Sequence, residues 1–252
     1  MKNYNTKIFD SSLEGSKYVA EQIKSLIELN DSKGRKTVLG LATGSTPIIM
    51  YKELIRMHKE EGLSFKNVIT FNLDEYCPME PTSEHSYWYF MHHNLFNHID
   101  VKPENINIPK GNLLDSEIPK YCNDYEAKID SLGGLDIQIL GIGRTGHIGF
   151  NEPGSEESSI TREVTLNQIT LDDAAPSFGG VENVPTKAIT MGVETVLKAK
   201  TVYLMAYGSG KSEIVSETLT SDVTSQVPAT FLQHHKNTIF VLDNEAASLL
   251  PA

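Results

Sequence analysis

The stretch from Asp136 to Pro153 constrains the fold more than any other part of the chain. The run at residues 137–140 is short and rich in β-branched side chains, which favours a buried strand over a helix. Four glycines between positions 141 and 149 then allow the backbone to turn sharply. Ligands of open α/β sheets bind beyond the carboxyl ends of the strands. We therefore expect the polar residues of this loop to lie at a functional site: His147, Asn151 and Glu152.

The same glycines raise the alternative of a dinucleotide site. Gly141, Gly143 and Gly146 form the pattern G-x-G-x-x-G. In a dinucleotide fingerprint this pattern opens a long helix of the first βαβ unit. Here it lies in the middle of the chain, and Pro153 with Gly154 interrupts any helix soon after it. We therefore expect no nicotinamide or flavin cofactor. A plain strand-to-loop turn would explain the glycines and would leave the polar residues without a role.

The length and charge of the chain exclude several function classes. With 252 residues, 39% of them apolar and 22% charged, the chain suits a globular protein, and we expect one domain over residues 1–252. The sequence has no run of about 18 apolar residues, so we expect no membrane partner. The formal charge of −11 argues against nucleic-acid binding. Any anionic substrate must then be bound by local groups.

The cysteines and histidines predict neither a disulfide framework nor a metal site. Cys77 and Cys122 do not form a zinc pattern, and the first residues lack the apolar core of a signal peptide, so a cytoplasmic protein is expected. Neighbouring His92 and His93 point to different faces of a helix, and no H-E-x-x-H pattern occurs. We therefore expect no metal ion.

A second loop predicts an anion site. The strand at residues 37–42 runs into the turn at 43–47 (TGSTP), and a helix follows to about Glu61. Ser45 or Thr46 would cap this helix, and Pro47 suits its first turn. Free N–H groups at a helix start favour negative charge by about 0.3–1 kcal/mol, and by up to about 2 kcal/mol when partly buried. The alternative is an ordinary capped helix without a ligand.

Two further strands deliver charged residues to the same edge of the sheet. The strand that begins at Asn67 ends in Asp74 and Glu75, which are either functional or simply solvated acids. The strand at 201–207 is followed by GSGKS, which resembles the end of a P-loop. The full pattern needs glycine where Met205 stands, so nucleotide triphosphate binding is not expected. Lys211 remains as a cation at this edge.

The long segment at about 154–184 is a candidate lid. It has scattered polar residues and is broken at Pro176 and at Gly179 with Gly180. Long irregular segments within compact domains are usually lids or binding loops.

Together these residues predict proton-transfer chemistry on a phosphorylated substrate. The turn at 43–47 and Lys211 suit a phosphate group, and Asp74 suits a general base. His147 with Glu152 could form a base and its orienting partner. The residues alone therefore predict a small phosphorylated substrate and leave the reaction open.

Five motifs then resemble one known family in order and spacing. They cover nearly the whole chain and are similar to the glucosamine-6-phosphate deaminase (isomerizing) family: LGLATGSTP, FNLDEY, LGIGRTGHIGFNEPG, AITMGVETVL and VPATFLQHH. The resemblance implies a three-layer α/β/α sandwich with a mostly parallel, modified Rossmann-like sheet. It also implies conversion of glucosamine 6-phosphate and water to fructose 6-phosphate and ammonia in amino-sugar catabolism, without a metal or organic cofactor.

The resemblance assigns a role to each site residue. His147 would take a proton during opening of the pyranose ring, with Glu152 as its partner and Thr145 at a position involved in that step. Asp74 would move a proton from C2 to C1 of the open chain. The remaining residues would bind the substrate and its phosphate: Thr43, Gly44, Ser45, Thr46, Gly143 and Lys211.

The chain departs from the family pattern at two places of the site. Relatives usually carry Asp or Asn where Thr145 stands, and threonine cannot supply a carboxylate. Relatives also have a lid arginine that contacts the phosphate, whereas residues 174–178 read AAPSF. A lost charged hydrogen bond costs about 1.5–3 kcal/mol unless Arg144 or Arg162 replaces it.

Other assignments therefore stay open beside the deaminase. These are a 6-phosphogluconolactonase-like hydrolase and a weakly active sugar-phosphate-binding paralogue. Allosteric relatives bind N-acetylglucosamine 6-phosphate through Ser, Arg and Lys. Ser155 and Arg162 match two of these, but Val164 replaces the lysine, so we expect weak or absent activation. The family includes monomers and hexamers, so a homo-oligomer is compatible with the resemblance.

Overall fold

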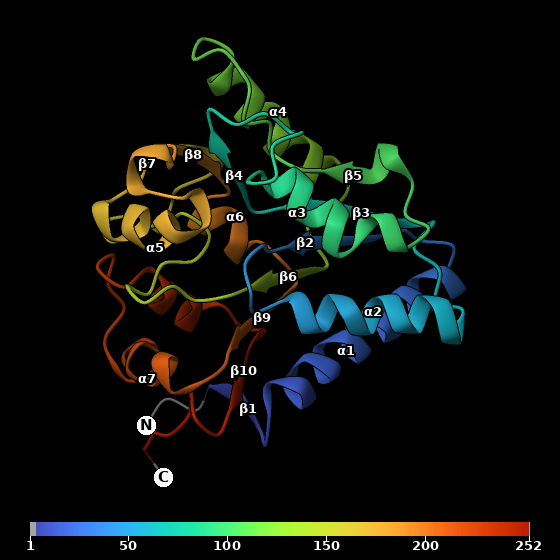
Figure 1. The fold of residues 1–252 in the computed structure, drawn as a ribbon. Coiled ribbons are helices and arrows are strands. Elements are labelled where there is room, and N and C mark those ends of the chain that lie inside the picture. The colour runs from blue at the N-terminus through green and yellow to red at the C-terminus, as the bar shows by residue number, and fades with distance from the viewer. Residues whose placement is uncertain (1–3, 252) are drawn as a thin grey trace.

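The computed structural model describes residues 4–251, whose strands form two sheets (Figure 1). The main sheet has seven strands in the order β1-β10-β9-β6-β2-β3-β5, and all its neighbouring strands are parallel. The second sheet is antiparallel, with the order β4-β8-β7. The strands of the main sheet are β1 Asn5–Phe9, β2 Thr37–Leu41, β3 Val68–Asn72, β5 Ile106–Asn107, β6 Ile137–Leu140, β9 Thr201–Ala206 and β10 Thr238–Asp243. Those of the second are β4 Asp74–Cys77, β7 Arg162–Thr165 and β8 Lys187–Thr190.

Helices cover both faces of the main sheet and confirm the predicted three-layer α/β/α architecture. Every residue of β2, β3 and β10 is buried, as expected when both faces of a parallel sheet are covered. The helices α1 and α2 pack against each other along one face (Figure 1). The α-helices are α1 Ser12–Ser32, α2 Ile48–Glu61, α3 Tyr87–Asn94, α4 Ile118–Ser131, α5 Gln168–Phe178, α6 Val193–Leu197 and α7 Ser212–Thr220. Short 3₁₀-helices lie at Phe96–His98, Pro103–Asn105, Val181–Asn183, Ser209–Lys211 and Pro228–His234.

None of the helices between residues 4 and 251 is long and apolar enough to cross a membrane.

The strand predicted to end in two acids is divided between the two sheets. β3 ends at Asn72, and the N–H of Leu73 donates to the carbonyl of Leu41 on β2. The chain then leaves the main sheet, and Asp74 is the first residue of β4, where it pairs with Thr190 of β8. Asp74 therefore lies above the carboxyl ends of β2 and β3, at the junction of the two sheets.

The helix after the turn at 43–47 starts without a side-chain cap, contrary to the prediction for Ser45 or Thr46. Helix α2 begins at Ile48, with Pro47 at the N-cap position and no capping hydrogen bond from its side chain. The N–H of Tyr51 donates to the carbonyl of Pro47, which starts the helical ladder.

The segment at 154–184 is more regular than its sequence predicts. Strand β7 joins its first part to the second sheet. Helix α5 follows, with Asn167 as N-cap and Gly179 as left-handed C-cap at φ 71°. Pro176 lies inside α5, near its end. The caps therefore define a short helix in a segment that reads as irregular.

Candidate active site

A cavity of about 240 Å³ lies where the loops after β2, β3 and β6 meet. Its lining includes Asp74 and His147, together with the turn at 43–46 and the glycines 141 and 143. The structure thus brings a carboxylate, an imidazole and the predicted anion turn to one cavity, although they come from distant parts of the chain. An ideal Cβ on Gly149 would lie 3.4 Å from Oδ2 of Asp74, so the His147 loop passes directly beside this carboxylate.

The turn at 43–46 is open on its cavity side. Gly44 has a φ of 91°, a conformation that favours glycine, and a Cβ placed there would meet no atom within 4 Å. The backbone here can therefore be approached closely by a ligand.

Asp74 is a buried acid that holds its proton more tightly than a free carboxyl does. Burial raises the pKa of Asp74 to about 8, and the neighbouring charge of Glu75 adds to this effect. Only 5% of the residue is exposed. Asp74 is therefore poised to take or give a proton near neutral pH.

Glu75, the other acid of the pair, has a structural position. Its carboxylate accepts hydrogen bonds of 3.0 Å from the backbone N–H groups of Tyr76, Tyr87 and Trp88. Two of these donors are the first residues of α3. Burial nevertheless raises the pKa of Glu75 to about 7, against the effect of these hydrogen bonds. Glu75 therefore fixes α3 to the strand that carries Asp74.

His147 is a neutral imidazole at neutral pH. Burial lowers its pKa to about 4, and the charge of Lys211 lowers it further. Its Nδ1 lies 2.9 Å from Oγ1 of Thr145, which is therefore its hydrogen-bond partner. A Cβ at Gly143 would overlap the imidazole ring, so glycine is required there for the ring to lie as it does.

The predicted pair of His147 with Glu152 is not formed, and this expectation is corrected. The chain turns at Gly149, and the amide of Asn151 donates to the carbonyl of Met191. Glu152 is thereby directed to α5, where its Oε2 accepts a 2.8 Å hydrogen bond from the N–H of Asn167. The other oxygen, Oε1, is buried without a hydrogen-bond partner.

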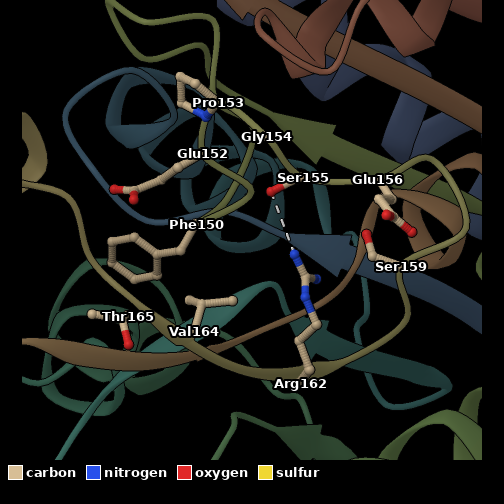
Figure 2. A pocket seen from close by; sticks show the side chains of 10 residues that line it. All are labelled: Phe150, Glu152, Pro153, Gly154, Ser155, Glu156, Ser159, Arg162, Val164 and Thr165. Carbon is tan, nitrogen blue, oxygen red and sulfur yellow. Dashed lines mark hydrogen bonds between the residues drawn. The ribbon is translucent and has the colours of Figure 1, made fainter.

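Glu152 instead lines a second cavity of about 520 Å³ (Figure 2). In this cavity Arg162 donates hydrogen bonds to Oδ1 of Asn151 at 2.9 Å and to Oγ of Ser155 at 3.4 Å. The carboxylate of Glu152 points away from Arg162 (Figure 2). Val164 also lines the cavity, at the position expected for the lysine of allosteric relatives.

Lys211 lies close behind the candidate active site. Its Nζ donates a 2.8 Å hydrogen bond to the carbonyl of Ile142, a residue that lines the 240 Å³ cavity. Burial lowers the pKa of Lys211, and the charge of Asp173 opposes this. Asp173 belongs to α5 and forms a 2.9 Å ion pair with Arg144. Arg144 is thus engaged with α5.

Tyr87 is a site residue that sequence reasoning missed. It lines the cavity, and its ring packs beside that of Tyr76 with the centroids 5.1 Å apart. The run SYWYF indicated only an aromatic helix, and nothing local in it distinguishes the one ring that faces the cavity.

Within residues 4–251, no group of three or more His, Cys, Asp or Glu side chains is arranged to hold a metal ion. The described site therefore offers acids, bases and hydrogen-bond donors.

Comparisons with known proteins identify relatives over nearly the whole chain. A family model described as glucosamine-6-phosphate isomerases/6-phosphogluconolactonase matches residues 11–241. A glucosamine-6-phosphate deaminase of Thermoanaerobacter sp. (strain X514) is 48% identical over 238 residues, which are 94% of this chain and 92% of that relative. The solved structure of a monomeric glucosamine-6-phosphate deaminase is 42% identical, with a TM-score of 0.92 over 98% of this chain and 100% of the other.

A 6-phosphogluconolactonase from Trypanosoma brucei shares the fold alone. It is 20% identical, with a TM-score of 0.79 over 99% of each chain. The match over residues 11–241 and the identity to deaminases lead to one conclusion. The chain belongs to the glucosamine-6-phosphate isomerase/6-phosphogluconolactonase family.

Proposed function

We propose that the chain is a glucosamine-6-phosphate deaminase, which converts glucosamine 6-phosphate and water to fructose 6-phosphate and ammonia. One observation carries this proposal: Asp74 and His147 line the same cavity as the turn at 43–46. The names of the relatives with 48% and 42% identity support it.

The phosphate binds at the turn, and the sugar extends toward the acid and the imidazole. The turn offers Thr43, Ser45 and Thr46 together with an open backbone at Gly44. Lys211 adds a positive charge from behind the loop at 141–143. The turn, with Lys211 behind it, provides local groups for an anion on a chain whose formal net charge is −11.

His147 opens the pyranose ring. As a neutral imidazole it takes the proton of the C1 hydroxyl and returns a proton to the ring oxygen, so that the C1–O5 bond breaks and C1 becomes an aldehyde. Thr145 orients the ring through its contact with Nδ1, which leaves Nε2 for the sugar. The hydroxyl of Thr145 does this without supplying a charge.

Asp74 carries out the isomerisation. In its ionised form it removes the proton from C2 and delivers it to C1, while a proton passes from the nitrogen on C2 to the C1 oxygen and C2 becomes an imine. Water then adds to C2 and ammonia leaves, which gives the ketone. An ammonium group at C2 of the bound sugar would favour the ionised form of Asp74, because opposite charges lower the pKa of an acid.

The deaminase is tested by coupled detection of ammonia and fructose 6-phosphate from glucosamine 6-phosphate. We expect turnover by the wild type and a loss of about 10²–10⁴ in kcat for Asp74→Asn, since Asp74 transfers the proton. Absence of ammonia above background at saturating substrate would contradict the proposal.

A weakly active sugar-phosphate-binding paralogue is the second candidate. It is favoured by Thr145 at the partner position of His147 and by the absence of an arginine from residues 174–178 of α5. This candidate predicts binding of the sugar phosphate by calorimetry with little ammonia release, and a higher rate in Thr145→Asp.

The compartment and pathway follow from the same proposal. Cys77 and Cys122 are free and buried, which suits the reducing cytoplasm. Glucosamine 6-phosphate as substrate places the enzyme in the breakdown of amino sugars, including N-acetylglucosamine.

A further inference from the structure

A third cavity, of about 690 Å³, adjoins the candidate active site. We call it the aromatic annex, because six ring side chains from β4, α3 with the residues before it, and α5 line it: Tyr76, His85, Tyr87, Tyr89, Phe90 and Phe178. Cavities that bind small molecules are typically lined by aromatic and apolar side chains with a few polar groups. The annex has this composition, with Glu84 and Ser177 among its polar residues.

The aromatic annex adjoins the site at the turn proposed for the phosphate. Gly44, Ser45 and Tyr87 line both cavities. Tyr87 and the turn are therefore walls that the two cavities share.

The walls of the annex are held by contacts between their own rings. Phe178 stacks on His85 at 4.6 Å and meets Tyr76 edge-on at 5.3 Å, which fixes the end of α5 against β4. Helix α5 contributes Ala174, Ser177 and Phe178 to the lining. No long aliphatic or charged side chain of α5 therefore fills the space beside the turn. Tyr89 is 42% exposed, which leaves part of its ring accessible.

We propose that the aromatic annex is a subsite for a second sugar ring carried by the phosphorylated amino sugar. The inference rests on the proposed function, because it places the phosphate at the turn and C1 with C2 at Asp74 and His147. The reaction needs a free C1 and an amine on C2, so the second ring must be attached elsewhere. The remaining ring hydroxyls are those on C3 and C4. The hydroxyl on C4 is nearer to C6 and its phosphate, and therefore nearer to the annex beside the turn. The substrate class is therefore an amino-sugar 6-phosphate that is glycosylated at O4.

The chemistry of the annex suits such a ring. The C–H faces of a pyranose are apolar and pack on aromatic faces, while its hydroxyls need polar partners at the rim. Tyr89 offers an exposed ring, and Glu84 and Ser177 offer oxygen atoms.

Calorimetry tests the subsite independently of turnover. In an Asp74→Asn background, in which we expect the reaction to be slower by about 10²–10⁴, we compare glucosamine 6-phosphate with its 4-O-β-glucosyl derivative. We expect the disaccharide phosphate to bind more tightly, and Tyr89→Ala to weaken it by about three- to tenfold while leaving the monosaccharide nearly unchanged. Trp88→Ala is the matched control: it lies on the same helix with 39% exposure but stacks on His92 at 3.8 Å, and it should change neither affinity.

A filling variant gives the opposite test. Ser177→Trp places a large ring in the annex and should abolish the advantage of the disaccharide phosphate while glucosamine 6-phosphate still binds. The proposal is overturned if the disaccharide phosphate binds no better than the monosaccharide in the Asp74→Asn background, or if Tyr89→Ala weakens both ligands equally. Ammonia assays with the wild type judge the deaminase separately, because a protein that deaminates glucosamine 6-phosphate but gains nothing from the second ring loses only the subsite.

Discussion

At the scale of single residues, the site depends on Asp74, a buried acid that keeps its proton to a higher pH than a free carboxyl does. The pKa of Asp74 is about 8 because the carboxyl is buried and Glu75 is its neighbour. The pKa of His147 is about 4, so this imidazole stays neutral over the range in which Asp74 titrates. The pKa of Asp74 is therefore raised and that of His147 is lowered. This suits Asp74 for proton transfer at carbon and His147 for proton transfer between oxygens.

The raised pKa of Asp74 predicts how stability depends on pH. Its folded-state pKa lies above the unfolded value of 3.8, so its contribution is fully present below pH 3.8 and is lost as pH rises toward about 8. Asp74→Asn, which mimics the protonated acid, should therefore gain thermal stability relative to the wild type as pH rises. Thermal unfolding at about pH 5 and about pH 9 measures this.

The same titration should appear in catalysis. We expect kcat/KM of the wild type to rise with pH toward about 8, because Asp74 must lose its proton in the free enzyme before it can act as a base. A difference in melting temperature between wild type and Asp74→Asn that does not change with pH would show that Asp74 is already ionised in the folded protein.

The close approach of His147 to Gly143 predicts that a substitution at position 143 lowers activity while the fold is kept. Gly143→Ala should displace the ring of His147, because a Cβ there overlaps it, and should lower kcat by about 10². Gly141→Ala is the control, since its nearest atom would be Oγ1 of Thr46 at an ordinary 3.9 Å. Steady-state kinetics with circular dichroism distinguishes the two. Equal activity of both variants would contradict this role of Gly143.

At the scale of elements, Glu152 connects the loop after β6 to α5. Its Oε2 accepts from the N–H of Asn167, and the side chain of Asn167 in turn caps α5 by accepting from the N–H of Thr170. The start of α5 is thus fastened by a buried carboxylate, while its end is fastened by Phe178 against His85 and Tyr76.

This connection predicts different effects for two substitutions. Glu152→Gln keeps an oxygen for Asn167 and should leave the pH profile and KM nearly unchanged. Glu152→Ala removes the acceptor, so we expect faster proteolysis within residues 168–183 and a KM raised by about two- to tenfold. A shift of the pH profile in Glu152→Gln would instead show that Glu152 acts on His147 during the reaction.

At the scale of the whole molecule, the second cavity shares Phe150 with the candidate active site and is only partly equipped for an anion. Arg162 and Ser155 are present there, but both hydrogen bonds of Arg162 to side chains go to neighbouring residues, and Val164 offers no charge. Burial also lowers the pKa of Arg162. Binding of an anion in this cavity would therefore gain little electrostatic energy.

We accordingly expect little effect of N-acetylglucosamine 6-phosphate on the rate. Initial rates against glucosamine 6-phosphate should be hyperbolic with and without this ligand. A sigmoidal curve that becomes hyperbolic on its addition would contradict the prediction. Val164→Lys tests the cause, because it adds the missing charge to the cavity wall.

Much of the architecture could be predicted from the chain alone. Short apolar runs followed by glycine turns indicated the parallel strands β2, β6 and β9, and their loops lie at one edge of the sheet as expected. These predictions hold because hydrophobic period and glycine placement act locally on the backbone.

Partners of side chains could not be predicted in the same way. Asp74 opens a strand of the second sheet instead of closing β3, because the chain leaves the main sheet at Leu73. Tyr87 and the aromatic annex depend on α3 and α5 meeting across the turn at 43–46, which no local pattern encodes.

The amino-acid sequence by itself determined the class of fold, the strand-end loops and the residue types that meet at the cavity. Only the tertiary structure decided that Thr145, and not Glu152, contacts His147. It also decided that α5 leaves an open cavity beside the turn at 43–46. The physical reason is that backbone turns follow from local sterics, whereas a side chain takes its partner from segments that long-range packing brings beside it.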